Sequence, residues 1–202
     1  MPLLPPVMQS LIQQRAALKL LSGSKMPSTV SAISSATCMY LLSFSNVNST
    51  NNVLGPGVGS QIGRIGSLIP SMMSDLILKK AKLEQMSGKD LASISEAVSF
   101  GVVNALKAVV IQGTVIGGGP GTGIGYIVGL SPSALKKQIM GQEFFRLMSG
   151  AKLGNIISAI SFGICNHIMT AGIVNITNIG AAAPPPVGPI PIPAAPGIGR
   201  FY

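Results

Sequence analysis

The glycines between residues 117 and 125 are the first candidates for chemistry, because glycine-rich loops can bind the phosphates of nucleotides. The run reads Gly-Gly-Gly-Pro-Gly-Thr-Gly-Ile-Gly and contains no G-x-G-x-x-G spacing. The Gly-Lys pair of a phosphate-binding loop occurs only at Gly88-Lys89, where Asp90 follows instead of Ser or Thr. Weaker glycine runs recur at residues 55–59 and 197–199. We therefore expect a structural turn and no cofactor, with a glycine-loop nucleotide binder as the remote alternative.

His167 is the only histidine, so almost every metal or nucleophilic site would need it. Its nearest neighbour with a ligand-type side chain is Cys165, and residues two apart on a helix point to different faces. His167 lies among apolar residues, so we expect a buried structural role and predict no metal site. Cys38 and Cys165 also lie in apolar segments, and two cysteines are too few for a disulfide framework. Both are expected as buried free thiols.

The carboxylates offer no pair for acid–base catalysis. They are few and scattered: Asp75, Glu84, Asp90, Glu96 and Glu143. Asp90 stands where a carboxylate would stabilise the N-terminus of the following helix. Any Ser-His-Asp or Cys-His arrangement would have to use His167. The sequence therefore predicts no catalytic residues and a protein that is not an enzyme.

Three diverged copies of one unit, each about sixty residues long, make up the chain. The dipeptide Ser-Gly occurs at positions 22, 87 and 149, and the surrounding segments align without gaps. A shared triplet follows each pair: Ala32-Ile33-Ser34, Ala97-Val98-Ser99 and Ala159-Ile160-Ser161. Repetition at a fixed period indicates a chain that is built from equivalent packing units.

Two helices are expected in each unit. Pro5, Pro70 and Pro132 should begin the first helix, because proline suits the first helical turn. The Ser-Gly pair should end it, with glycine in the left-handed conformation of a helix C-cap. The second helix is expected at residues 27–43, 91–108 and 153–170. Small residues on it would let another helix approach closely, and the interface candidates are Ala97, Gly101, Ala159 and Gly163.

A β-prone run and a glycine-rich segment complete the unit. The run is clearest at residues 109–116 and 173–179, whereas residues 46–52 of the first copy read as a polar loop. Each copy ends near a glycine-flanked triplet: Gly57-Val58-Gly59, Gly123-Ile124-Gly125 or Gly197-Ile198-Gly199. The predicted fold class is α+β and mainly α. It consists of three tandem copies of helix, Ser-Gly turn, helix, short strand and glycine loop, in a pseudo-threefold arrangement or a short array.

The expected organisation has three repeats and a tail. The repeats cover residues 5–69, which diverge most, then 70–131 and 132–180. The tail, residues 181–202, is rich in proline and glycine, and such runs favour the extended polyproline II conformation. We expect this arm to reach across a neighbouring subunit. Its interface candidates are Pro184, Pro185, Pro186 and Pro191.

Charge is scarce throughout the sequence. Charged residues make up 9% and hydrophobic residues 47%, whereas about 25% is usual for charged residues in a soluble domain. We therefore expect lipid or other protein subunits to cover much of the surface. The 14 basic and 5 acidic residues give a net charge of +9. That charge allows non-specific contact with nucleic acid, but no nucleic-acid-binding motif is present.

Lipid and protein are the two alternatives for the covering of this surface. A membrane span needs about 20 mainly apolar residues, and the second helix of the second repeat contains Glu96 and Lys107. The flanking belts of Trp and Tyr that are typical of spans are also absent. We therefore favour contact with protein and keep a small oligomeric membrane protein, of the holin or channel type, as the alternative.

The paired helices with small-residue faces, and loops such as residues 119–125, resemble small virion structural proteins of tailed bacteriophages, particularly tail and baseplate components. The resemblance covers residues 87–130 and 149–180. It implies a subunit of a ring or plate that is synthesised in the host cytoplasm and resides in the virion. The expected function is a non-enzymatic structural subunit that forms homo-oligomers and contacts other virion proteins.

Overall fold

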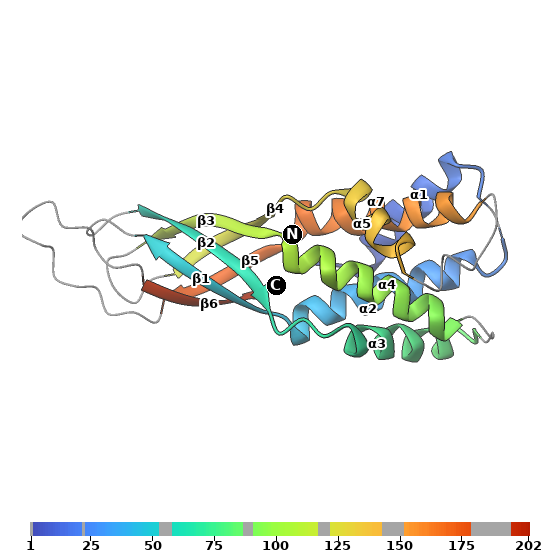
Figure 1. The fold of residues 1–202 in the computed structure, drawn as a ribbon, viewed down its shortest axis with the longest axis horizontal. Helices are drawn as coiled ribbons and strands as arrows, with labels where there is room; N and C mark the ends of the chain where they lie inside the picture. The colour runs from blue at the N-terminus through green and yellow to red at the C-terminus, as the bar shows by residue number, and fades with distance from the viewer. Residues whose placement is uncertain are drawn as a thin grey trace, which may run out of the picture.

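The computed structural model describes residues 2–21, 23–52, 58–86, 91–116, 122–142, 152–178 and 195–202. Within these residues, two helices followed by two strands occur three times along the chain (Figure 1). In order, the elements are α1 (Pro5–Leu18), α2 (Met26–Phe44), β1 (Asn46–Asn52), β2 (Val58–Gly66), α3 (Pro70–Leu83), α4 (Leu91–Ala108), β3 (Val110–Ile116), β4 (Thr122–Val128), α5 (Pro132–Met140), α7 (Leu153–Ala171), β5 (Ile173–Asn178) and β6 (Ala195–Phe201).

The strands form a closed antiparallel barrel in which each strand pairs with the next, and β6 returns to pair with β1. Opposing residues in the register are Val47 with Ile65, Ile111 with Ile127, and Val174 with Phe201. All of these side chains are buried, so they form an apolar layer at the end of the barrel nearest the helices. Closure leaves the barrel without an unpaired strand edge.

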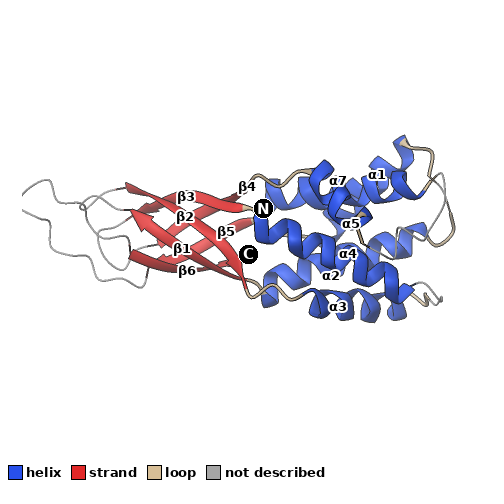
Figure 2. Cartoon of the chain, viewed as in Figure 1, coloured by secondary structure: helices blue, strands red, loops and turns tan. Residues whose placement is uncertain are grey.

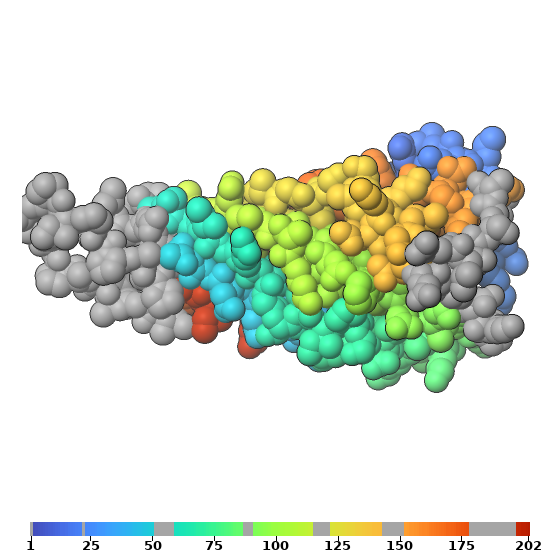
Figure 3. All heavy atoms as spheres, viewed as in Figure 1, coloured from blue at the N-terminus to red at the C-terminus, as the bar shows by residue number. Residues whose placement is uncertain are grey.

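The helices form a second closed ring, stacked end to end with the barrel (Figures 1 and 2). In this ring α1 packs against α2, α2 against α3, α3 against α4, α4 against α5, α5 against α7, and α7 against α1. The second helix of each unit runs directly into an odd-numbered strand. The first helices therefore end, and the second helices begin, at the end of the molecule away from the barrel, which the space-filling view shows as the broader end (Figure 3).

Gly101 and Gly163 allow helices of neighbouring units to cross closely. A Cβ atom on Gly101 would lie 2.9 Å from the backbone nitrogen of Ile139, and one on Gly163 would lie 2.8 Å from that of Ile12. The equivalent residue of the first unit is Ala36, which is fully buried. Each crossing joins the second helix of one unit to the first helix of the next. The three units therefore stabilise one another around the ring.

The predicted fold class is wrong. We expected one short strand per unit in a mainly helical tandem array, whereas each unit contributes two strands to a closed antiparallel barrel. The fold is a barrel-containing α/β fold. Strands are usually recognised by apolar side chains at alternate positions. Here several inward-facing positions are glycines, among them Gly63, Gly125 and Gly199, so the even-numbered strands read as glycine loops.

Two details of the strand prediction fail for related reasons. Residues 46–52, expected as a polar loop, form β1: Val47 and Ser49 are buried, while Asn48 and Thr50 are exposed. The first-copy counterpart of Gly123-Ile124-Gly125 is Gln-Ile-Gly at residues 61–63, because Ile62 and Ile124 occupy equivalent places opposite threonines. The triplet that we had aligned, residues 57–59, begins outside the described residues.

The beginnings of the helices agree with the sequence. Pro5, Pro70 and Pro132 each begin a first helix as predicted. The second helices, Met26–Phe44, Leu91–Ala108 and Leu153–Ala171, match the expected ranges to within one residue at each end. Helix starts could be predicted because a proline and a continuous run of helical spacing specify them locally.

The ends of the first helices differ from the prediction. Leu20 and Gln85 hold the left-handed conformation, with φ of 54° and 52°. The N–H of Leu21 donates to the carbonyl of Ala16, which closes a Schellman cap around Leu20. The Ser-Gly dipeptides at positions 22, 87 and 149 lie wholly or partly outside the described residues. In the first two units the cap therefore precedes the Ser-Gly pair and uses residues other than glycine.

Candidate functional site

The first helices α1 and α3 begin without a capping side chain of their own. Leu4 and Ile69 occupy the two N-cap positions, and the first N–H groups of a helix need acceptors. The Leu4 N–H donates to Nε2 of His167 at 3.0 Å. The Ile69 N–H donates to the hydroxyl of Tyr40, and that hydroxyl donates to the Ile69 carbonyl at 3.1 Å. Side chains of the preceding unit in the ring therefore cap both helices.

The third unit caps its first helix differently. Ser131 is the N-cap of α5, and its hydroxyl oxygen accepts from the Ala134 N–H. The residue of α4 at the position of Tyr40 and His167 is Ala105, which carries no acceptor. His167 and Tyr40 thus share one structural role, which the sequence did not reveal. This role accounts for the buried position of the single histidine.

His167 can cap α1 only while its ring is neutral. It is 2% exposed, and burial lowers its pKa. Since Nε2 accepts a hydrogen bond, the proton of the neutral ring must lie on Nδ1. Nδ1 is buried and has no hydrogen-bond partner within the described part of the chain. Protonation at Nε2 would remove the acceptor for the Leu4 N–H.

We expect acidification to destabilise the protein through His167. Because its pKa is lower in the folded state, the unfolded chain takes up this proton at a higher pH than the folded chain. The free energy of unfolding should fall as the pH drops through the ordinary histidine pKa of about 6.5, and level off below the folded pKa. Thermal melts between about pH 5 and pH 8 would measure this slope.

The control is His167→Tyr, because a tyrosine at the equivalent position, Tyr40, caps helix α3 in the same way. Tyrosine does not titrate in this range, and His167 is the only histidine of the chain. The variant should therefore lack the histidine part of the slope, while the carboxylates titrate alike in both proteins. Parallel pH profiles for the two proteins would contradict the capping role.

Neither cysteine is available as a nucleophile. Cys38 and Cys165 are free and 0% exposed. Burial raises the pKa of each thiol to about 12, so both stay protonated at neutral pH and are poor nucleophiles. Among the described side chains, no group of three or more His, Cys, Asp or Glu residues could bind a metal ion.

The three units fill the barrel interior unequally. Gln61 is 1% exposed and lies where the other units have Gly123 and Gly197. Its side chain occupies space that glycines leave free: a Cβ atom on Gly113 would lie 2.6 Å from Gln61 Nε2, and one on Gly125 would lie 3.0 Å from it. Within the described residues neither polar atom of this amide has a hydrogen-bond partner. The Gln61 side chain therefore fills space inside a narrow barrel.

The outer face of the barrel repeats more faithfully. Ile62, Ile124 and Ile198 occupy equivalent positions and are 57%, 45% and 50% exposed. Each lies between a threonine on one neighbouring strand and an amide residue on the other. The three trios are Thr50, Ile62 and Gln112; Thr114, Ile124 and Asn175; and Thr177, Ile198 and Asn48. All of these residues are exposed, and we call them the barrel band.

The helical interface candidates from the sequence lie inside the chain. Ala97 and Ala159 are 3% and 1% exposed, and Gly101 and Gly163 are buried against helices of the next unit. The proline candidates lie outside the described residues: Pro184, Pro185, Pro186 and Pro191. The end of the tail, Ala195–Phe201, forms β6 and closes the barrel.

The barrel band was missed although the sequence carries a signal for it. Residues 61–65 read Gln-Ile-Gly-Arg-Ile, residues 123–127 read Gly-Ile-Gly-Tyr-Ile, and residues 197–201 read Gly-Ile-Gly-Arg-Phe. Aligned by Ile62, Ile124 and Ile198, these segments alternate in the way a strand requires. Glycine at the inward positions hid this alternation.

No protein family model, curated protein or solved structure matches the chain.

Proposed function

We propose that the chain is a non-enzymatic structural subunit that lies on a threefold axis of a larger protein assembly. The barrel band carries this proposal, because the same trio of threonine, isoleucine and amide faces outward three times around one barrel. Such a surface offers equal contacts to three copies of one partner subunit. Closed rotational symmetry is the usual arrangement of subunits in protein assemblies.

The contrast between the two faces of the barrel supports this proposal. Two sets of inward positions next to the band differ between the units: Ser49, Gly113 and Ile176 are equivalent, as are Gln61, Gly123 and Gly197. A third set, Gly63, Gly125 and Gly199, is identical. Packing usually constrains interiors more strongly than surfaces. Here the exposed isoleucine and threonine positions are identical in all three units. Contact with solvent alone gives no reason to keep three half-exposed isoleucines.

Strand propensity is the competing explanation for the band. Isoleucine and threonine are both common in strands, so they could recur without any partner. Asparagine is depleted in strands, yet the third position of each trio is Gln112, Asn175 or Asn48. Exposed amides beside the band isoleucines are better explained as hydrogen-bonding groups for a partner surface.

The remaining observations agree with a structural role. The described cysteines are buried and protonated, and His167 caps a helix. Charged residues make up only 9% of the chain, as suits a subunit whose surface is partly covered by neighbours. The resemblance to phage tail and baseplate proteins makes a virion the expected setting. The closed barrel has no strand edge to offer a second copy, so we propose contacts with different subunits.

Helix α7 is the one described helix that is long and apolar enough to cross a membrane. Its mean hydropathy is 1.2, and half of the apolar window is buried in the fold. The core helix of a folded protein passes the same test, and α7 packs against α1 and α5 in the ring. We therefore do not extend the proposal to a membrane-embedded oligomer.

Photo-crosslinking in the native assembly tests the threefold contact. A photoreactive residue would replace Ile62, Ile124 or Ile198, one at a time, and Glu96 on the exposed face of α4 would serve as the control position. We expect the three barrel positions to give the same cross-linked partner, and native mass spectrometry to show three partner subunits per chain. Different partners at the three positions, or another stoichiometry, would overturn the proposal.

A further inference from the structure

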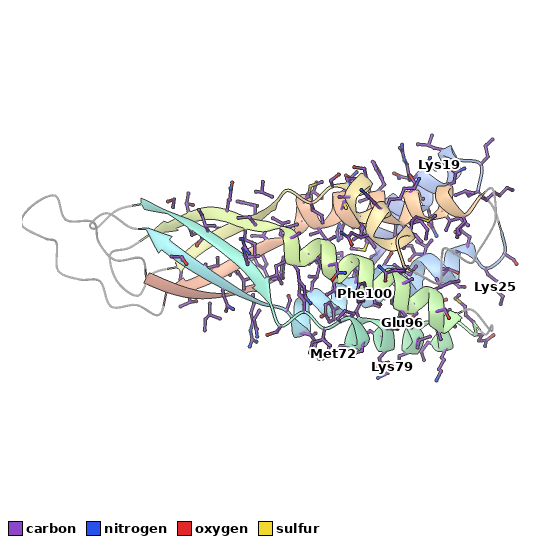
Figure 4. All side chains as sticks on the ribbon, viewed as in Figure 1. Lys19, Lys25, Met72, Lys79, Glu96 and Phe100 are labelled. Atoms are coloured by element: carbon purple, nitrogen blue, oxygen red, sulfur yellow. The ribbon has the colours of Figure 1, made fainter. Side chains whose placement is uncertain are left out.

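A second unusual surface lies at the opposite end of the molecule, where the first helices end and the second helices begin. We call it the helical apex and define it by Leu18, Lys19, Leu20, Lys25, Lys80, Lys82, Leu83 and Lys152. Leu18, Leu20 and Leu83 are 76%, 85% and 71% exposed, more than any other large apolar side chain in the described part of the chain. Lys19 and Lys25 project from this end (Figure 4).

The charge at the helical apex is mainly positive. Glu84 is the single carboxylate among the described residues between the helices of each unit. It accepts a hydrogen bond from the Ser31 hydroxyl at 2.9 Å. Lys79 precedes Lys80 on α3, and Glu96 lies five residues after the start of α4, so both are closer to the barrel. The barrel carries only Arg64 and Arg200 among its described charges. The most exposed leucines therefore share one end of the molecule with five of the twelve described basic residues.

Stabilisation of the helices does not account for all of these lysines. Lys80 and Lys82 lie in the last turn of α3, where a cation interacts favourably with the helix dipole. Lys25 and Lys152 are the N-cap residues of α2 and α7, where the same dipole disfavours a cation. The helix dipoles therefore do not explain why lysine occupies these two positions. Binding of an external anion is the better explanation for both lysines.

The backbone conformation of Leu20 is also unfavourable for a leucine. Its φ of 54° is left-handed, a conformation that glycine and asparagine adopt more easily than leucine. The cap buries Leu21, which is 8% exposed, and leaves Leu20 in solvent. The equivalent residue Gln85 has nearly the same φ but a polar side chain. A strained, fully projecting leucine beside Lys19 indicates a surface that meets something apolar.

We infer that the helical apex docks on a bilayer surface that contains anionic lipids. Its leucines insert between the headgroups and its lysines contact the lipid phosphates. Exposed leucines beside lysines are the composition that interfacial membrane-binding segments use, and each lysine near an anionic leaflet adds attraction. Nucleic acid would engage the lysines but would gain nothing from three leucines, since base stacking needs aromatic or guanidinium groups.

Vesicle co-sedimentation of the full chain tests this inference. The probes are vesicles of pure phosphatidylcholine and of equimolar phosphatidylcholine and phosphatidylglycerol. We expect binding to the anionic vesicles that weakens with added salt, and little binding to the neutral ones. The combined variant Leu18→Gln, Leu20→Asn and Leu83→Gln should bind anionic vesicles about tenfold less. Glutamine favours helices and asparagine tolerates the left-handed conformation, so the fold should persist.

The matched control removes the same number of exposed apolar side chains from the barrel band. The combined variant Ile62→Thr, Ile124→Thr and Ile198→Thr keeps strand-forming residues and should bind vesicles like the unchanged protein. Absence of binding to anionic vesicles, or equal binding by the apex variant, would overturn the inference. The inference would also be overturned if the protein bound duplex DNA but not vesicles, and if the leucine substitutions left the DNA binding unchanged. Vesicle binding does not involve the barrel partner, so this inference and the threefold contact can fail separately.

Discussion

Gly113→Ala should disrupt the barrel and lower the free energy of unfolding by about 3 kcal/mol or more. A Cβ atom at this position would overlap the carbonyl oxygen of Ile124, and it would lie 2.7 Å from the Gly125 Cα and 2.6 Å from Gln61 Nε2. The amide of Gln61 could move, but Ile124 and Gly125 contribute backbone atoms of β4 that belong to the ladder with β3. The methyl group can be accommodated only if these two strands separate.

Urea unfolding followed by circular dichroism would measure this loss. The control is Gly23→Ala, because no atom lies within 4 Å of a Cβ atom built on Gly23. It should change the free energy of unfolding by less than about 1 kcal/mol. If Gly113→Ala does not fold, its spectrum compared with that of Gly23→Ala reports the loss directly. Equal unfolding midpoints for both variants would show that the barrel is wider than described.

Much of the helical layer could be predicted from the sequence because its signals are local. A proline at the start specifies α1, α3 and α5, and continuous helical spacing specifies the second helices. The Schellman cap at Leu20 could not be predicted, because no glycine marks it. Local rules place a glycine at such a site, and the chain instead uses a leucine whose exposure is better explained by a partner than by stability.

The barrel could not be predicted because its signals are not local. A narrow barrel replaces inward side chains by glycine, and Gly63, Gly125 and Gly199 removed the alternation by which strands are recognised. Pairing of β6 with β1 joins residues that are far apart in the sequence, such as Gly199 and Val47. The sequence marks neither partner of that pair as a neighbour of the other.

The role of His167 was hidden for the same reason. The equivalent residues, Tyr40 and Ala105, differ from histidine and from each other, so the sequence shows no repeated feature at this position. Its hydrogen bond reaches Leu4, 163 residues away, and only closure of the helical ring brings the two together. The shared capping role of His167 and Tyr40 becomes visible once α7 is known to pack against α1.

Gln61→Met should raise the stability of the protein. The change keeps a long, flexible side chain in the space beside Gly113 and Gly125. It also removes two buried polar atoms that have no hydrogen-bond partner within the described part of the chain. Leaving such a group unsatisfied costs about 1–3 kcal/mol, so the melting temperature should rise by several degrees, at about 2–4 °C per kcal/mol for a chain of this size.

Gln112→Met is the matched control for this change. Gln112 lies on the adjacent strand opposite Ile62, but its side chain is exposed, so the same substitution relieves no buried amide. Calorimetric melts of both variants should show a rise only for Gln61→Met. A fall for Gln61→Met with no change for Gln112→Met would mean that water inside the barrel satisfies the amide. The interior would then be wet, and the filler role of Gln61 would be wrong.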